Sequence, residues 1–234
     1  MQDPNKIIIA LDMASDNDVM ALLRQLDPSS CRVKIGKELF TRYGPDLVRR
    51  VADMGFDIFL DLKFHDIPNT VNKAVAAAAD LGVWMLTLHA AGGSDMLRAA
   101  RDAVDNREHK PLLVAVTLLT SLAENDLAIQ GVARSPLEQV QRLASLAQEC
   151  GMDGVVCSAA EVSELRMLLR KDFLLVTPGI RPQGDAANDQ KRIVTPAAAI
   201  QQGSDYLVIG RPITRAREPI EKLALIQQEI SGVQ

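Results

Sequence analysis

The chain has 234 residues, of which 47% are hydrophobic and 24% are charged, and its formal net charge is −4. This balance is that of an ordinary globular protein, so neither a disordered chain nor a membrane-embedded one is expected. A mildly acidic chain also offers no general surface for nucleic acid, so any phosphate group must be bound by a local site.

No signal or membrane segment is expected at the start of the sequence, because the apolar run Ile7–Leu11 is short and is followed by Asp12. The three cysteines are an odd number without the close spacing of metal ligands, and each lies in an apolar segment. We therefore predict reduced, buried thiols and a cytoplasmic protein.

Short apolar runs rich in β-branched residues recur along the chain, and each is followed by a longer segment with helical periodicity. This alternation predicts βα units around a parallel sheet. The runs are Ile7–Leu11, Arg32–Ile35, Asp57–Leu62, Trp84–Leu88, Leu112–Leu118, Gly154–Cys157, Leu174–Val176 and Tyr206–Ile209. Eight such units fit a (β/α)8 TIM barrel of the α/β class, with residues 1–234 forming a single catalytic domain.

Helix signals and irregular stretches separate these runs. Pro136 opens one helical segment, and Gly151 stands where that segment ends. The stretch Thr120–Ser135 is polar and is expected to be a loop, and Pro178–Arg192 is also irregular. Long loops in a compact domain are often binding loops or lids, so both stretches are candidates for ligand contact.

The segment from Asp61 to Thr70 ends the third apolar run with an alternating set of charges. Successive side chains of a strand point to opposite faces, so Asp61 and Lys63 are expected side by side on one face. Asp66 follows where the chain turns toward a helix. Taken alone, the segment also fits a structural ion pair and a helix cap, since Asp is a favoured N-cap and Pro68 suits a first helical turn.

Other predicted strands also end in polar residues. In a TIM barrel the loops after the carboxyl ends of the strands build the active site. The polar residues at or just beyond these ends are Asp12, Lys34, Asp61, Lys63, His89, Thr117, Thr120, Ser121 and Arg211. Buried unpaired charges are costly, so such a set must pair internally or receive a charged ligand.

A phosphate site is predicted after the last two strands. Gly210–Pro212 directly follows the eighth run, and Pro178–Arg181 follows the seventh. Barrels of this type often bind phosphate at that place, where a backbone amide next to glycine approaches closely and arginine offers a two-pronged donor.

A metal site is not predicted at His89, because no second His, Cys or acidic residue lies at metal-like spacing from it. Trp84 and Met85 open the fourth run and are expected to pack between the barrel and its helices. The candidate site is therefore one of charged side chains without a metal.

Taken together, the motifs resemble the bacterial type of the orotidine 5′-phosphate decarboxylase family. The likeness covers essentially the whole chain. Its motifs are Ala10–Asp12, Val33–Gly36, Asp61–Thr70, Leu118–Ser121, Thr177–Arg181 and Ile209–Pro212. The spaced set is specific, whereas the short Asp-x-Lys-x-x-Asp pattern alone is shared with related barrels that act on sugar phosphates.

The resemblance implies decarboxylation of orotidine 5′-phosphate to uridine 5′-phosphate (UMP), the last step of de novo UMP synthesis, by a homodimer without metal or organic cofactor. It implies an alternating charge array of Lys34, Asp61, Lys63 and Asp66. Asp66 and Thr70 would reach the active site of the neighbouring subunit. Lys63 would donate a proton to C6 of the pyrimidine.

The resemblance also implies contacts to the rest of the substrate. The ribose hydroxyls would meet Asp12 and Lys34, and the loop over the pyrimidine would contain Thr120 and Ser121. The implied phosphate-binding residues are Gln190, Gly210 and Arg211, with Arg181 nearby.

Two other functions stay open. One is a magnesium-dependent sugar-phosphate decarboxylase or aldolase on the same barrel, but relatives of that kind carry an acidic metal ligand on the second strand where this chain has Lys34. The other is a non-catalytic protein that binds a nucleotide through its phosphate.

Overall fold

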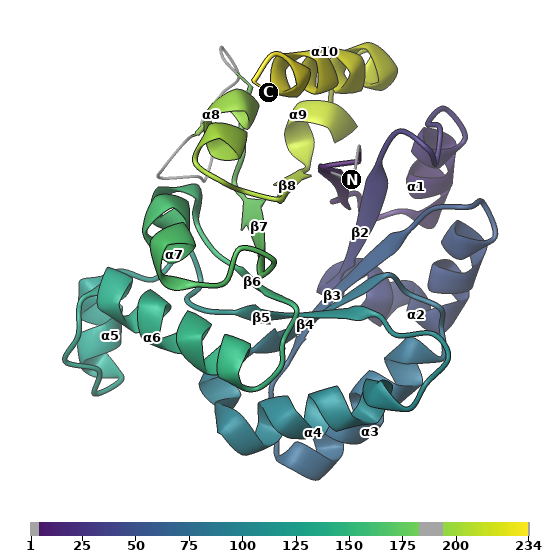
Figure 1. Cartoon of the computed structure of the whole chain (residues 1–234). Helices are drawn as coiled ribbons and strands as arrows, with labels where there is room; N and C mark the ends of the chain where they lie inside the picture. The colour runs from purple at the N-terminus through teal and green to yellow at the C-terminus, as the bar shows by residue number, and fades with distance from the viewer. Residues whose placement is uncertain (1–4, 183–193, 234) are drawn as a thin grey trace.

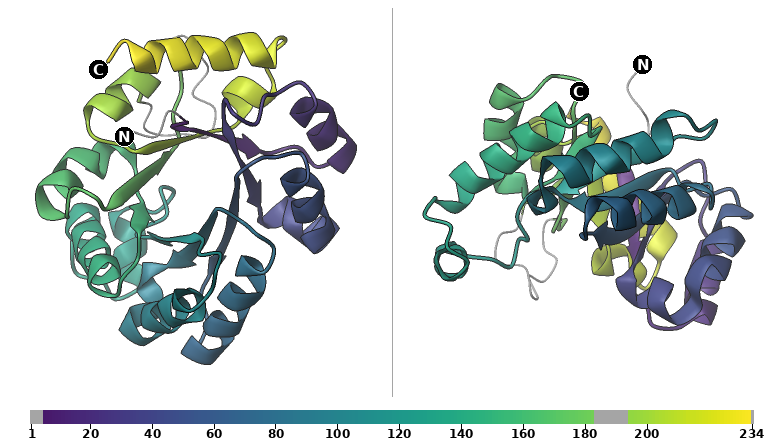
Figure 2. Two further views of the ribbon diagram at one scale, coloured as in Figure 1. Left: turned by 45° about the vertical axis from the view of Figure 1, so that its right-hand side comes forward. Right: turned by 90° about the horizontal axis from the view of Figure 1, so that it is seen from below.

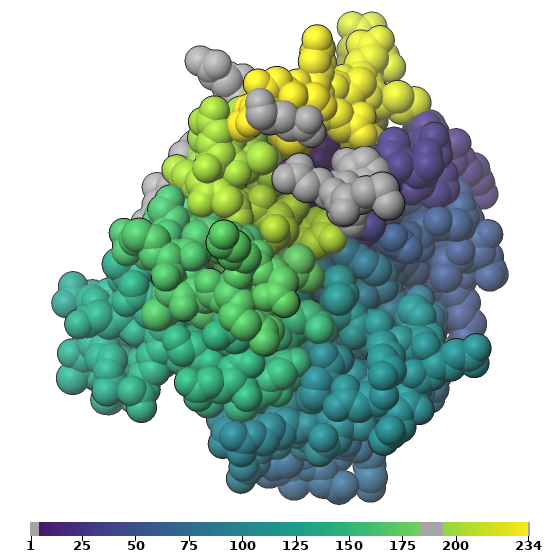
Figure 3. Space-filling model, in the orientation of Figure 1, coloured from purple at the N-terminus to yellow at the C-terminus, as the bar shows by residue number. Residues whose placement is uncertain are grey.

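The computed structural model describes residues 5–182 and 194–233, and its strands close into a parallel barrel surrounded by helices (Figure 1, Figure 2). Each strand pairs with the next in the chain, and β8 pairs with β1. The colours in Figure 3 run around the molecule so that the first and last segments meet. The strands are β1 (Ile7–Leu11), β2 (Arg32–Gly36), β3 (Ile58–Phe64), β4 (Met85–His89), β5 (Leu112–Val116), β6 (Gly154–Val156), β7 (Leu174–Pro178) and β8 (Tyr206–Ile209). The predicted (β/α)8 barrel is confirmed.

The helices form the outer layer of the molecule (Figure 2). They are α1 (Asp16–Leu23), α2 (Lys37–Ala52), α3 (Pro68–Ala79), α4 (Gly93–Asp105), α5 (Glu124–Ile129), α6 (Pro136–Glu149), α7 (Val162–Leu168), α8 (Pro196–Gln201), α9 (Arg211–Thr214) and α10 (Pro219–Ser231), with short 3-10 turns at Ala90–Gly92 and Ala159–Glu161. Pro136 begins α6, and Gly151 follows its end with a φ of 79°, as predicted. Among the described residues no helix is long and apolar enough to span a membrane.

The stretch from Thr120 to Ser135 was expected to be a loop, and that expectation is wrong in part because it contains α5. The carboxylate of Asp126 accepts a hydrogen bond from the backbone N–H of Ala123 at 2.8 Å, which caps the start of the helix. Leu127 is buried, so the helix is also fixed by packing. Six residues are too few for a periodicity signal, and the polar composition hid this helix.

Strand alternation builds two hydrophobic layers. Side chains of one parity fill the barrel interior, and those of the other parity, such as Ile9, Leu60 and Leu86, pack beneath the helices. The interior set is Ile8, Phe59, Met85, Val114, Val176, Tyr206 and Val208. Because the interior is packed, a ligand can enter only near the strand ends.

The amino end of the barrel is closed around Arg32. Its guanidinium carbon lies 4.2 Å from the ring centroid of Trp84 and 5.4 Å from that of Tyr206, and Nε lies 3.2 Å from the Asp57 carboxylate. The two rings meet edge to face at 5.1 Å. The expectation that Trp84 and Met85 pack between barrel and helices is wrong, since both belong to the interior layer. The pairing of Met85 with Phe59 gives Met85 the inward parity. Trp84, one residue earlier, lies at the amino end of the barrel against Arg32 and Tyr206.

Candidate active site

Three charged side chains meet where β2 and β3 end. Nζ of Lys63 lies 2.7 Å from Oδ1 of Asp61, and Nζ of Lys34 lies 3.3 Å from Oδ2 of the same carboxylate. The side chains are only 12% (Asp61), 16% (Lys34) and 26% (Lys63) exposed. One carboxylate thus serves two ammonium groups inside the barrel mouth, and the predicted neighbourhood of Asp61 and Lys63 is confirmed.

The backbone of Lys63 is unusual. Its φ of 54° is the only positive value at a non-glycine residue in the described chain, and such a conformation costs roughly 1–2 kcal/mol. The pairing of β3 with β4 shifts at this point, since Leu60 pairs with Leu86 and Phe64 with Leu88. Three residues of β3, Asp61–Lys63, therefore lie opposite Thr87 of β4, which forms a bulge. The two extra residues keep the alternation in step, so Asp61 and Lys63 both line the cavity while Leu62 and Phe64 pack against the outer layer.

The pKa of Asp61 reflects this arrangement. Burial by itself raises the pKa, but the ammonium groups of Lys34 and Lys63 and hydrogen bonds from Lys63 and Thr87 outweigh it. The pKa of Asp61 is therefore held below its ordinary value of 3.8, and the carboxylate is charged at neutral pH. A charged Asp61 in turn holds the two ammonium groups at the edge of the barrel interior.

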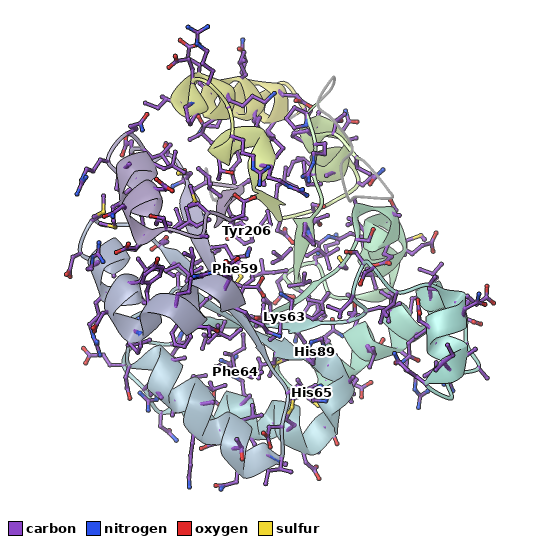
Figure 4. The ribbon with its side chains drawn as sticks, turned by 180° about the vertical axis from the view of Figure 1, so that it is seen from behind. Phe59, Lys63, Phe64, His65, His89 and Tyr206 are labelled. Carbon is purple, nitrogen blue, oxygen red and sulfur yellow. The ribbon has the colours of Figure 1, made fainter. Side chains whose placement is uncertain are left out.

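A cavity of about 190 Å³ opens beside Lys34, Asp61 and Lys63. Lys34, Asp61 and Lys63 supply its charges, and Thr120 reaches it from the segment after β5. Figure 4 shows Lys63 near the centre of the barrel, between Phe59 and His89. The apolar lining consists of Phe59, Val116, Leu118, Leu119, Val156, Cys157, Pro178 and Val208. A flat heterocycle could therefore lie against an apolar floor with the ammonium groups at one side.

Sequence reasoning missed Thr87. This residue is fully buried on β4, and its hydroxyl contacts both the Lys63 backbone and the Asp61 carboxylate. The signal that could have found it is register: Phe59 pairs with Met85, so the residues two further on, Asp61 and Thr87, share the inward face.

The predicted phosphate site lies at the adjoining strand ends. Gly210 directly follows β8, and a Cβ placed on it would lie 3.0 Å from the carboxylate of Asp12. Asp12 accepts a hydrogen bond from the hydroxyl of Thr214 at 2.6 Å, which ties the end of β1 to α9. Arg211 begins α9 and is partly exposed. Arg181 is buried, and its guanidinium donates to the carbonyl of Ile180 at 2.9 Å.

Some predicted residues do not join the cavity. Asp66 and Thr70 are exposed, and no described contact links Asp66 to Lys34, Asp61 or Lys63. Ser121 is exposed and does not line the cavity. Gln190 lies outside the described residues.

The helix-cap alternative for Asp66 is wrong in detail. Helix α3 begins at Pro68 as expected, but its N-cap is Ile67. The carboxylate of Asp66 instead accepts a hydrogen bond from the N–H of Ile67 at 2.6 Å. The side chain therefore stands at the surface, where a second molecule can reach it.

Two histidines stand beside the array. The rings of His65 and His89 lie side by side with centroids 5.4 Å apart, and His89 ends β4 (Figure 4). Burial lowers the pKa of His89 below its ordinary 6.5, and the positive charges of His65, Lys37 and Lys63 lower it further. No cluster of three or more His, Cys, Asp or Glu side chains suited to a metal ion occurs in residues 5–182 and 194–233.

A closed parallel barrel that gathers paired charges around a cavity at the carboxyl ends of its strands has the architecture of a (β/α)8 enzyme. The chain belongs to the orotidine 5′-phosphate decarboxylase / HUMPS family, whose model matches residues 5–226.

Curated relatives match the chain over its whole length. It is 55% identical over 231 residues to the orotidine 5′-phosphate decarboxylase of Nitrosococcus oceani, covering 99% of this chain and 100% of the relative. It is 56% identical over 233 residues to the enzyme of that name from Nitrosomonas europaea, with both chains covered completely.

A solved structure agrees with the fold. The orotidine 5′-phosphate decarboxylase of Lactobacillus acidophilus superimposes with a TM-score of 0.86 at 40% identity, covering 97% of this chain and 99% of the other. The resemblance seen in the sequence is thus confirmed, and the magnesium-dependent and non-catalytic alternatives are not favoured.

Proposed function

We propose that the protein decarboxylates orotidine 5′-phosphate to UMP, which makes it a carboxy-lyase of pyrimidine biosynthesis. The observation that carries the proposal is the Lys63 ammonium, held 2.7 Å from Asp61 at the edge of a cavity of about 190 Å³. Family membership and full-length relatives of that name support it.

The chemistry requires positive charge at one carbon. When the bond from C6 to the carboxylate breaks, CO2 leaves and the electron pair stays on C6. A carbanion there gains little resonance stabilisation, so a preorganised cation lowers the barrier. Lys63 supplies that charge and then transfers a proton from Nζ to C6, and solvent later reprotonates the amine. Asp61 holds the Lys63 ammonium in place until that moment.

The remaining site residues bind the substrate away from C6. Asp12 and Lys34 hold the ribose hydroxyls, and Thr120 and Ser121 belong to the segment over the pyrimidine. Gly210 and Arg211 at the start of α9, with Gln190 and Arg181, bind the phosphate. Binding energy from the phosphate contributes to catalysis because it fixes C6 against Lys63.

The proposed assembly is a homodimer in which Asp66 and Thr70 reach the neighbouring active site and complete the charge array. The exposed segment supports this, since Ile67 beside Asp66 is 66% exposed and apolar. We also propose one catalytic domain in the cytoplasm, where the three buried cysteines remain thiols.

Mixing inactive subunits tests the shared site. Lys63→Ala and Asp66→Ala subunits should together recover roughly a quarter of wild-type activity, because half of randomly mixed dimers are heterodimers and each restores one site. Lys63→Ala mixed with Asp61→Ala is the matched control and should recover nothing, since these residues belong to one subunit's cavity. No recovery in the first mixture, despite demonstrated subunit exchange, would refute the shared site.

The activity itself is tested by following orotidylate absorbance with EDTA present. We expect the wild-type protein to consume orotidylate at a rate that the chelator does not change. Loss of activity in EDTA would favour the magnesium-dependent alternative. Binding of UMP without any turnover of orotidylate would favour a nucleotide-binding protein.

A further inference from the structure

Thr87 is a buried hydroxyl placed between the two halves of the catalytic ion pair. It is fully buried in β4 on the inward face. Its Oγ1 accepts a hydrogen bond from the backbone N–H of Lys63 at 2.8 Å and lies 3.0 Å from Oδ1 of Asp61. A carboxylate can only accept, so the hydroxyl proton must point to Asp61.

The same carboxylate oxygen also accepts from Nζ of Lys63 at 2.7 Å. Three residues therefore form a closed network: the Lys63 backbone N–H donates to Thr87, the Thr87 hydroxyl donates to Asp61, and the Lys63 ammonium donates to the same Asp61 oxygen. The direction in which the ammonium points depends on both ends of the Lys63 residue, its backbone and its terminal nitrogen.

The backbone end needs such an anchor. Lys63 has a positive φ, and the ladder between β3 and β4 is interrupted there, so its N–H has no regular strand partner. A strained conformation persists only where its surroundings enforce it. Thr87 supplies an acceptor at the point where the strand cannot.

We propose that Thr87 is a positioning residue whose hydroxyl locks the left-handed backbone of Lys63 and the carboxylate of Asp61 into one geometry, so that the ammonium meets the reacting carbon. The inference rests on the proposed decarboxylase activity. Thr87 does not line the cavity, so it acts through Lys63 and Asp61 and not on the substrate.

A second buried threonine provides a control that distinguishes positioning of Lys63 from a purely structural role. Thr177 on β7 is also fully buried, and its hydroxyl lies 2.8 Å from that of Ser204, away from the charge array. Thr87→Val and Thr177→Val make the same chemical change at equal burial. Only the first removes a contact to the catalytic ion pair.

In Thr87→Val we expect kcat and kcat/KM to fall together by about 10- to 100-fold, because a small displacement of a catalytic group has an effect of this order. The dissociation constant for UMP should stay within about twofold, because the phosphate and ribose contacts lie elsewhere. Thr87→Ser keeps the hydroxyl and should return kcat to within about threefold of wild type. Thr177→Val should keep wild-type kcat.

The pH profile gives a readout that packing alone would not move. The Thr87 hydrogen bond is one of the contacts that lower the pKa of Asp61. Its removal raises that pKa, so the acidic limb of kcat should begin at a higher pH in Thr87→Val than in wild type or Thr87→Ser.

Several outcomes would overturn the proposal. Wild-type kcat in Thr87→Val would do so, and so would equal damage in Thr87→Ser and Thr87→Val, which would assign the effect to packing. Circular dichroism establishes folding, and if the valine variant does not fold, Thr87→Cys, a weaker donor of similar size, replaces it in the comparison with serine. If wild type and Thr177→Val are both inactive on orotidylate, the proposed function fails, and the role of Thr87 fails with it.

Discussion

Two cationic side chains of strand β2 point into the barrel, and they have different surroundings at its two ends. Arg32 at the amino end is 8% exposed and lies over Trp84 and Tyr206. Lys34, two residues on and with the same inward parity, faces the cavity and shares one carboxylate with Lys63. At the amino end the cation completes a packed core, whereas at the carboxyl end an excess of positive charge faces open space.

The difference shows that a buried charged side chain is not by itself evidence of a functional site. The amino end satisfies Arg32 with aromatic faces and the Asp57 carboxylate, so no ligand is needed there. Within one chain, the carboxyl end leaves two ammonium groups on one carboxylate, an arrangement that an anionic ligand or the proposed Asp66 of a second subunit would balance. A variant at the carboxyl end should therefore lower turnover and leave stability nearly unchanged, and a variant at the amino end should lower stability and leave turnover nearly unchanged.

The largest expected effect is on turnover at the carboxyl end. Lys63→Ala should lower kcat for orotidylate by at least about 10³-fold, because it removes both the proposed proton donor and the cation proposed to lie beside C6. UMP should still bind, since the proposed phosphate contacts are elsewhere. Orotidylate absorbance and UMP titration measure the two quantities, and substantial remaining turnover would exclude Lys63 as the proton donor.

The thermal unfolding of Lys63→Ala should change little. The side chain is 26% exposed, and Asp61 keeps its contact with Lys34. A large drop in melting temperature would mean that the carboxyl-end array also stabilises the fold, and the contrast between the two ends would be weaker than described.

At the amino end, Arg32→Met should lower stability and leave chemistry intact. The variant loses a cation over two rings and its hydrogen bonds, which we expect to cost about 2 kcal/mol, or roughly 4–8 °C in melting temperature. Asp57 adds little to this loss because its side chain is 56% exposed.

Arg49→Met is the matched control for Arg32→Met, since the Arg49 side chain is 60% exposed. The melting temperature of Arg49→Met should equal that of wild type. The kcat of Arg32→Met should stay within about twofold of wild type. A melting temperature of Arg32→Met equal to that of Arg49→Met would contradict the view of the amino end as a structural closure.

The sequence predicted the barrel and the core of its site because both depend on local pattern. Apolar runs set the strands, and charges at the end of the third run placed Asp61 beside Lys63. A local sequence pattern does not show which residues of two neighbouring strands pair with each other. The bulge at Lys63 and the inward face of Thr87 follow from how β3 pairs with β4, and that depends on two segments together.

The inward position of Trp84 was missed for a related reason. Its aromatic character suggested packing under helices, but its place depends on Arg32 and Tyr206, which come from distant strands. The proposed roles of Asp66 and Thr70 require a second molecule, which the sequence of one chain does not describe. Their exposed positions in one chain agree with a shared site without testing it.

The smallest predicted effect concerns His89, whose titration reports the excess positive charge at the carboxyl end. Burial and the neighbouring His65, Lys37 and Lys63 lower its pKa below 6.5. The unfolded chain therefore binds the proton more readily than the folded one, so His89 contributes a loss of stability as pH falls through 6.5 toward its folded pKa.

Imidazole proton shifts in nuclear magnetic resonance spectra, assigned with His89→Gln, should give a midpoint below 6.5. Lys63→Ala should move that midpoint upward because one positive charge is lost, and UMP should move it upward because an anion offsets the positive charges. Arg32→Met, at the other end of the barrel, should leave it unchanged. A midpoint at or above 6.5 in the free protein would contradict the effect of burial and of the neighbouring positive charges together. A midpoint unchanged by both Lys63→Ala and UMP would mean that the charge of Lys63 does not act on His89.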